Sequence, residues 1–178
     1  AKKDYFIALT EFHFMNLQTM SEIGYYPGMK QFHDSVNGVL RAWAGRDLDS
    51  PWPQPIASAL IPYMDEVGVD VAFCLREPMM DITGGTVSMS TNEPYPGRMY
   101  LEANVGPMIK RGMKNAIWEL EYLVKERGAK LCKVYQPEDD GPINDRRLWP
   151  FYEKACELGV PLTVHTGMSY VCPQPSSH

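Results

Sequence analysis

Short apolar runs alternate with amphipathic segments along much of the chain. The runs predict strands over residues 5–9, 69–75, 99–105, 129–135 and 160–164. Between them, apolar residues recur every three or four positions and predict helices over 56–67, 115–127 and 145–158. Runs without polar alternation are typical of strands buried on both faces. The pattern therefore predicts an α/β fold with a parallel sheet and right-handed crossovers.

Boundary residues support these helices. Gly128 and Gly159 follow the second and third helices, where a left-handed residue commonly ends a helix. Asp145 is placed to cap the third helix. Pro62 predicts a kink or a later start in the first helix, and Pro150 predicts a tight or kinked first turn in the third.

Two stretches have no clear periodicity. We interpret residues 15–55 as an irregular insertion that holds one short helix over 36–44. Residues 79–98 are rich in Met, Thr, Gly, Ser and Pro and predict no element. The whole chain, residues 1–178, is otherwise interpreted as one domain.

Composition narrows the class of protein. Hydrophobic residues make up 44% and charged residues 22% of the 178 positions, as in globular proteins. The net charge is -5 and no basic cluster occurs, which argues against a nucleic-acid partner. The chain contains no run of 18 apolar residues, so the sequence predicts no membrane-spanning helix. The short polar start, Ala1 to Tyr5, does not resemble a secretory signal, so a cytoplasmic location is expected.

The four cysteines show neither CxxC nor knuckle spacing. Cys74 and Cys132 lie in predicted strands and Cys156 in a predicted helix. Buried free thiols explain Cys74, Cys132, Cys156 and Cys172 better than disulfides or a zinc cluster.

Polar side chains gather where the predicted strands end. Chemistry in parallel α/β folds concentrates at the carboxyl ends of strands. The residues found there are Glu11, His13, Arg76, Glu77, Asn104, Lys133, Tyr135, Gln136, His165 and Thr166. They are the candidates for an active site.

Three of these residues form a possible metal site. Glu11 and His13 are two positions apart on an extended chain, so their side chains point to the same face. His165, from another strand end, would supply a third ligand. A carboxylate with imidazoles suits Zn²⁺ and other divalent transition metals, with Mn²⁺ as the alternative. The spacing alone leaves open a second interpretation, in which each histidine is a hydrogen-bonded structural residue.

The other candidates have competing interpretations. Arg76 could clamp a substrate carboxylate or form a surface salt bridge. Lys133 could act in catalysis, as a carbamylated metal bridge, or simply orient polar groups inside a barrel. Asn104 and Tyr135 are candidates for substrate binding. His33 has no partner by spacing and is interpreted as a surface residue.

Several segments resemble one enzyme family. The Glu11-x-His13 motif after the first strand is similar to that of the amidohydrolase-related family that includes the aromatic acid decarboxylases. Residues 131–137 resemble its fourth-strand lysine segment, and 142–155 resemble the helix that follows. Residues 158–167 resemble the strand that delivers a metal-binding histidine. The resemblance covers 56–75 and 99–167 well and 15–55 poorly.

The resemblance implies a (β/α)8 TIM-type barrel with one metal ion at its mouth. Glu11, His13 and His165 would be ligands, and a later histidine and aspartate would complete the site. A whole barrel needs about 250 residues, so only about the first five strands are expected here. We therefore expect a partial barrel whose edge is covered by a partner, either in a homo-oligomer or by a second chain that supplies the missing strands.

Three functions remain open. The first is decarboxylation of a small aromatic or cyclic carboxylic acid, with the metal holding the carboxylate. The second is metal-dependent hydrolysis of a lactone, ester or amide. The third is a non-catalytic binding half of a larger assembly. A five-stranded flavodoxin-like open sheet is a weaker alternative for the fold.

Overall fold

The computed structural model describes residues 4–12, 57–75, 96–135, 139 and 141–166, with single positions between 30 and 45. His13, Arg76 and Cys172 lie outside the described residues. In the predicted insertion, residues 37–39, 41 and 42 are helical, which fits the expected short helix. No described helix has the length and apolar character needed to cross a membrane.

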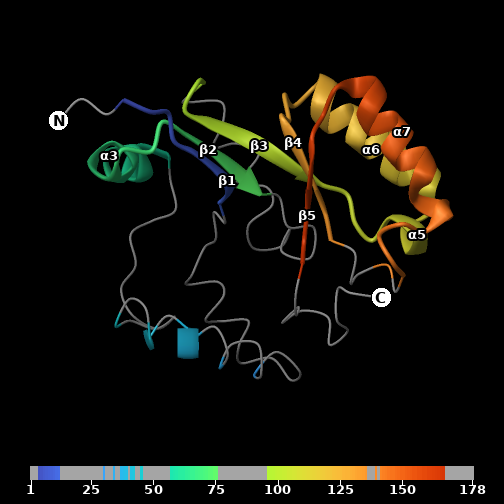
Figure 1. The fold of residues 1–178 in the computed structure, drawn as a ribbon, viewed down its shortest axis with the longest axis horizontal. Coiled ribbons are helices and arrows are strands. Elements are labelled where there is room, and N and C mark those ends of the chain that lie inside the picture. Colours follow the sequence, from blue (N-terminus) through green and yellow to red (C-terminus); the bar gives the residue numbers. More distant parts are fainter. Residues whose placement is uncertain are drawn as a thin grey trace.

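Five parallel strands form the sheet. They are β1 (Ala8–Phe12), β2 (Val71–Leu75), β3 (Met99–Asn104), β4 (Leu131–Val134) and β5 (Leu162–Val164). Each strand pairs with the next in chain order, so the sheet runs β1-β2-β3-β4-β5 (Figure 1). A flavodoxin-like sheet has the order 2-1-3-4-5, so that alternative is wrong. The five strands are instead part of a (β/α) barrel, as the sequence predicts.

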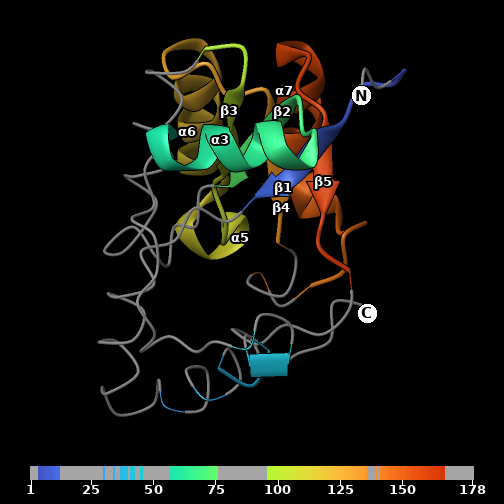
Figure 2. The same cartoon turned by 90° about the vertical axis from the view of Figure 1, so that its left-hand side faces the viewer.

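The helices lie in the crossovers. Helix α3 (Ala57–Val67) connects β1 to β2, and α5 (Met108–Arg111) and α6 (Met113–Lys125) connect β3 to β4. The 3-10 helix η3 (Arg146–Leu148) and α7 (Trp149–Leu158) connect β4 to β5. Figures 1 and 2 show α6 beside α7 along the same part of the sheet, and the two helices contact each other.

In the described part of the chain, the long helices α3, α6 and α7 cover one face of the sheet. Leu101 and Ala103 of β3 pack in a core cluster with residues of α6 and α7, including Leu120 and Phe151. Met99, on the same side of β3, packs with Met64 of α3 and with Ala72 and Cys74 of β2. Alternate residues of a strand point to opposite faces. Tyr100, Glu102 and Asn104 therefore face the other side, which is the interior of the partial barrel.

Helix ends follow the expected chemistry. The Asp145 carboxylate accepts a hydrogen bond from the Arg147 backbone N–H at 2.8 Å, as a cap does. Pro150 lies in the first turn of α7, directly after η3, so the predicted tight turn is confirmed. Gly159 ends α7 with φ 67° and ψ 30°, a left-handed conformation that favours glycine. Helix α3 begins at Ala57 and continues through Pro62, so the predicted later start is wrong.

The first strand lies later than predicted. It spans residues 8–12 rather than 5–9, and Tyr5 and Phe6 are exposed. Asp70 explains the shift, because its carboxylate accepts a hydrogen bond from the Ile7 N–H at 2.7 Å and its own N–H donates to the Ile7 carbonyl at 2.9 Å. The polar residue Glu11 is tolerated in β1 because its carboxylate pairs with the Lys133 ammonium of β4.

The thiols divide into two kinds. Cys74 and Cys132 are buried and free, as predicted, whereas Cys156 is exposed, so the prediction of burial is wrong there. Burial raises the pKa of Cys74 to about 12 and also raises the pKa of Cys132. Cys156 lies on the solvent side of α7, which helical periodicity alone did not separate from the core side.

Asp139 joins the loop after β4 to the start of α5. Its carboxylate accepts hydrogen bonds from the Met108 N–H at 2.9 Å and the Ile109 N–H at 2.7 Å, and only 4% of the residue is exposed. Replacing Asp139 by alanine leaves these N–H groups without their acceptor. We expect the free energy of unfolding to fall by about 1–3 kcal/mol in urea denaturation. Replacing the exposed Glu153 by alanine is the control, and an equal loss there would contradict this role.

Candidate active site

The carboxyl ends of the strands bring the described candidates to the barrel interior. Lys133 of β4 extends to β1, where its ammonium forms an ion pair with the Glu11 carboxylate oxygen Oε2. Only 4% of the Lys133 side chain is exposed, against 37% of Glu11. The two residues are 122 positions apart in the chain, so the fold alone brings them together.

Glu102 lies deeper on the same face. It is fully buried on β3, and its Oε1 accepts a hydrogen bond from the Thr163 hydroxyl of β5. Within the described part of the chain, its second oxygen Oε2 has no hydrogen-bond partner. Sequence analysis missed this residue because it lies inside an apolar run. A single charge within such a run was the available signal.

The environment of Glu102 favours its neutral form. Burial is the main cause that raises its pKa from 4.5 to about 7, and the negative charge of Glu11 adds to the effect. The Thr163 hydrogen bond and the positive charge of Lys133 act in the opposite direction. Near neutral pH, Glu102 is thus a carboxyl group that can hold or release a proton.

This shift makes a prediction about stability. Between pH 4.5 and about 7 the folded protein binds more protons at Glu102 than the unfolded chain does, so stability falls as pH rises through this window. We expect a decrease of about 1–3 kcal/mol relative to the Glu102→Gln variant, whose amide does not titrate. Urea denaturation at several pH values measures both proteins. Parallel pH profiles would show that the folded-state pKa of Glu102 is not raised.

His165 follows β5 beside Tyr135. Its backbone N–H donates to the Val134 carbonyl at 3.0 Å, which continues the pairing of β5 with β4. The Tyr135 and His165 ring centroids are 4.4 Å apart with the planes inclined by 54°. The His165 Nε2 atom is buried and has no hydrogen-bond partner among the residues that the structure describes. A buried imidazole nitrogen of this kind is suited to binding a metal ion.

Asn104 lies at the end of β3 and is fully buried. Its side-chain oxygen accepts a hydrogen bond from the Gly106 N–H at 3.1 Å, which holds the turn after the strand. Asn104 therefore stabilises the turn after β3. Its role in substrate binding stays a prediction.

The donor set fits a divalent cation. Glu11 and His165 supply a carboxylate and an imidazole, which are ligand types that Zn²⁺ and Mn²⁺ accept. A carboxylate has about four lone-pair sites, so Glu11 has a site for a cation, but the Lys133 ammonium that it pairs with would compete with the cation for its charge. Among the described residues alone, no three His, Cys, Asp or Glu side chains form a metal-binding group. The third predicted ligand, His13, is outside that set, and so is the predicted substrate clamp Arg76.

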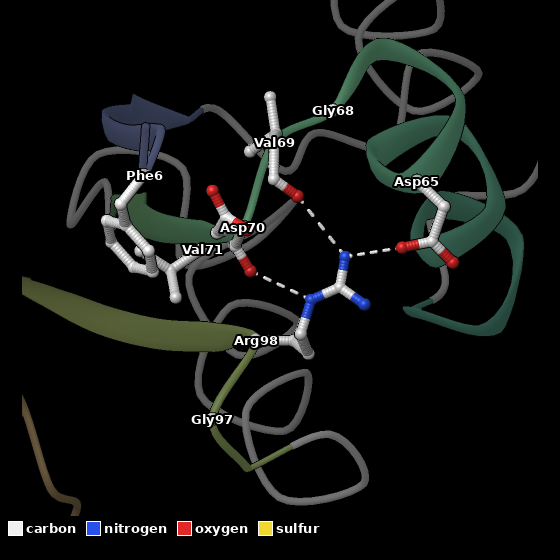
Figure 3. A pocket seen from close by; sticks show the side chains of 8 residues that line it. All are labelled: Phe6, Asp65, Gly68, Val69, Asp70, Val71, Gly97 and Arg98. Carbon is white, nitrogen blue, oxygen red and sulfur yellow. Dashed lines mark hydrogen bonds and ion pairs between the residues drawn. The ribbon is translucent and has the colours of Figure 1, made fainter. Parts of the chain in front are cut away.

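A separate hollow lies at the opposite end of the strands. Figure 3 shows Arg98, just before β3, pointing between α3 and the start of β2. Its Nε donates to the Asp70 carbonyl at 2.8 Å, and its Nη2 donates to Asp65 Oδ1 at 2.7 Å and to the Val69 carbonyl at 3.2 Å. The amino ends of barrel strands are typically associated with stability. The hollow is lined by Phe6, Asp65, Gly68, Val69, Asp70, Val71, Gly97 and Arg98.

Comparisons with known proteins agree with this architecture. Residues 99–177 match the family model described as Amidohydrolase. No curated protein matches the chain. Over the matched residues, the chain is similar to amidohydrolases.

Solved structures share the fold. The chain resembles 5-carboxyvanillate decarboxylase from Novosphingobium aromaticivorans, with bound manganese and 3-methoxy-4-hydroxy-5-nitrobenzoic acid, at 17% identity and a TM-score of 0.60. That alignment covers 97% of this chain and 53% of the decarboxylase. A probable 2-pyrone-4,6-dicarboxylic acid hydrolase from Acinetobacter baumannii, with citric acid bound, has 13% identity and a TM-score of 0.56 over 92% of this chain and 50% of the hydrolase.

A third structure is an uncharacterised TIM-barrel protein from Bordetella bronchiseptica. It has 14% identity and a TM-score of 0.61, with 94% of this chain and 58% of that protein covered. The chain thus spans between half and three fifths of the length of these three structures. Together with the strand order, these likenesses identify the fold as a partial (β/α) barrel.

Proposed function

We propose that this chain forms the metal-binding half of an amidohydrolase-type enzyme that acts on a small aromatic or cyclic carboxylic acid. The observation that carries the proposal is the buried His165 Nε2 without a described partner, on the barrel face that also holds Glu11. The family match over residues 99–177 includes His165 and supports the assignment.

Glu11, His13 and His165 are the proposed ligands of one divalent ion. When bound, the ion supplies positive charge that can hold a substrate carboxylate or activate water. Manganese in the decarboxylase structure makes Mn²⁺ a candidate beside Zn²⁺. Tyr135 contacts the His165 ring and would hold it in one orientation, as surrounding groups commonly do for metal-bound histidines.

Decarboxylation is the proposed reaction. Glu102 supports this proposal, because burial raises its pKa to about 7 and such a carboxyl group can stay protonated near neutral pH. Arg76 is proposed to clamp the substrate carboxylate, with Asn104 and Tyr135 as further substrate contacts. Loss of carbon dioxide requires that a proton replace the carboxyl group on the ring carbon, and a protonated acid in the interior supports such a transfer.

Hydrolysis of a lactone is the second candidate. The observation that favours it is the fold likeness to a probable pyrone dicarboxylic acid hydrolase. Both reactions need the same ligands, so substrate turnover separates them. The remaining barrel strands, from a continuation of the chain or from a partner, would complete either site.

Turnover of two acids tests the function. The purified protein, loaded with Mn²⁺ or Zn²⁺, is incubated with a hydroxybenzoic acid that carries a second carboxyl group and with a pyrone dicarboxylic acid. Carbon dioxide release from the first supports decarboxylation, and ring opening of the second supports hydrolysis instead. A metal-loaded protein that turns over neither acid would contradict the proposed substrate class.

A further inference from the structure

Among the residues that the structure describes, Lys133 is a buried cation that interacts with two carboxyl groups of the barrel interior. Lys133 is 4% exposed and pairs with Glu11, while Glu102 is fully buried on the neighbouring strand β3. The Lys133 charge lowers the pKa of Glu102, and the Glu11 charge raises it, so the three groups act on one another. Lys133 thus interacts with two carboxyl groups, Glu11 and Glu102.

A metal ion bound to Glu11 would weaken the attraction between Glu11 and Lys133. The ion would draw electron density from the same carboxylate that now pairs with Lys133 and would repel the ammonium. A buried ammonium without a counter-charge is strongly unfavourable. Metal binding at Glu11 therefore requires a second acceptor for Lys133, or its free-energy cost would weaken the site.

Glu102 is placed to be the second acceptor for the Lys133 ammonium. Asn104 pairs in register with Lys133, and Glu102 is two residues earlier on the same face of β3. Its Oε1 is fixed by Thr163, whereas Oε2 has no hydrogen-bond partner in the described ranges. A lysine ammonium carries three donors, so it can leave Glu11 for Oε2 by rotation of its flexible stem.

We propose that Glu102 is a positioning residue of the metal centre, which takes the ammonium of Lys133 when Glu11 binds the ion. The inference rests on the proposed function, because it presumes a cation at Glu11. Lys133, which pairs with Glu11 in this structure, would then turn to Glu102 on metal uptake. Glu102 acts only through Lys133, so its contribution disappears when the lysine is removed.

A double-mutant cycle on metal affinity tests this dependence. The dissociation constants of Zn²⁺ and Mn²⁺ are measured by competition with a chelating dye for the wild type, Glu102→Gln, Lys133→Met and the double variant. We expect Glu102→Gln to weaken binding about tenfold in the wild-type background. In the Lys133→Met background it should change affinity by less than about twofold, as independent sites would.

Two further variants guard against a structural explanation. Lys133→Arg keeps the positive charge, so the loss caused by Glu102→Gln should return in that background. Thr163→Val removes the hydroxyl that binds Glu102 but keeps the carboxylate, and it should weaken metal binding less than Glu102→Gln does. Thermal unfolding of each variant shows whether it is folded.

The outcomes separate two failures. A wild-type protein that binds neither ion overturns the proposed function and this inference with it. A wild-type protein that binds metal, with equal losses from Glu102→Gln whether or not Lys133 is present, overturns the inference alone. If Glu102→Gln has no effect in either background, the metal site stands without a role for Glu102.

Discussion

Replacing His165 by alanine is expected to weaken Zn²⁺ or Mn²⁺ binding by about a hundredfold or more, because groups that merely orient ligands already contribute ten- to a hundredfold. His165 supplies the buried nitrogen that has no partner within the described chain, and its ring is held against Tyr135. Replacing His165 removes a proposed metal ligand itself, not a group that only orients a ligand. Metal content after dialysis and the dissociation constant from dye competition both measure the effect.

His33→Ala is the matched control. The sequence gives this histidine no partner by spacing, so its removal should change metal affinity by less than about twofold. If His165→Ala and His33→Ala bind the ion equally well, the assignment of His165 as a ligand is wrong. Tyr135→Phe is a second control, because it keeps the ring that contacts His165 and should retain both the fold and most of the bound metal.

Replacing Phe151 by alanine should lower the free energy of unfolding by about 3–5 kcal/mol, which is typical for a large buried aromatic side chain. Phe151 is fully buried in the cluster between α7, α6 and the sheet. Alanine would leave a cavity that close-packed neighbours such as Leu120 can fill only in part. Urea denaturation followed by circular dichroism gives the difference.

Trp149→Ala serves as the comparison on the same helix. Trp149 is 53% exposed, and the Arg146 guanidinium lies 5.8 Å from its ring centroid. Its loss should destabilise the protein by about 0.5–1 kcal/mol, the size of an exposed cation–π contact. Equal losses at positions 149 and 151 would contradict the described packing of α7.

Much of the fold could be predicted because local chemistry and packing agree. The apolar runs that became β2, β3 and β4 are largely buried, so their composition directly reflects their surroundings. Asp145, Pro150 and Gly159 act through the backbone within one turn, and such effects are visible in sequence. The parallel direction of the strands followed from strand–helix alternation, whereas the barrel order was implied by the family resemblance.

The parts that were missed depend on distant contacts. The extent of β1 is set by Asp70, 63 residues away from the Ile7 N–H that it binds. The four-residue helix α5 is too short for a periodic pattern, and it is capped by Asp139 from another loop. No local pattern can show either contact before the chain is folded.

The candidate site was predicted in part for the same reason. Lys133 and His165 could be named because strand ends are recognisable, and the structure places both beside other candidates. Their partners were not predictable, since the Lys133–Glu11 pair crosses 122 positions. Glu102 was hidden within an apolar run, although a buried charge at such a position always needs an explanation.

The most direct test of the metal centre is anomalous X-ray diffraction from crystals of the protein grown with Zn²⁺ or Mn²⁺. We expect one strong peak about 2.0–2.3 Å from both the His165 Nε2 atom and a Glu11 carboxylate oxygen. The His13 imidazole should complete the first ligands, with Lys133 turned away from Glu11. A peak at any other place in the molecule, with Glu11 still paired to Lys133, would contradict the proposed centre.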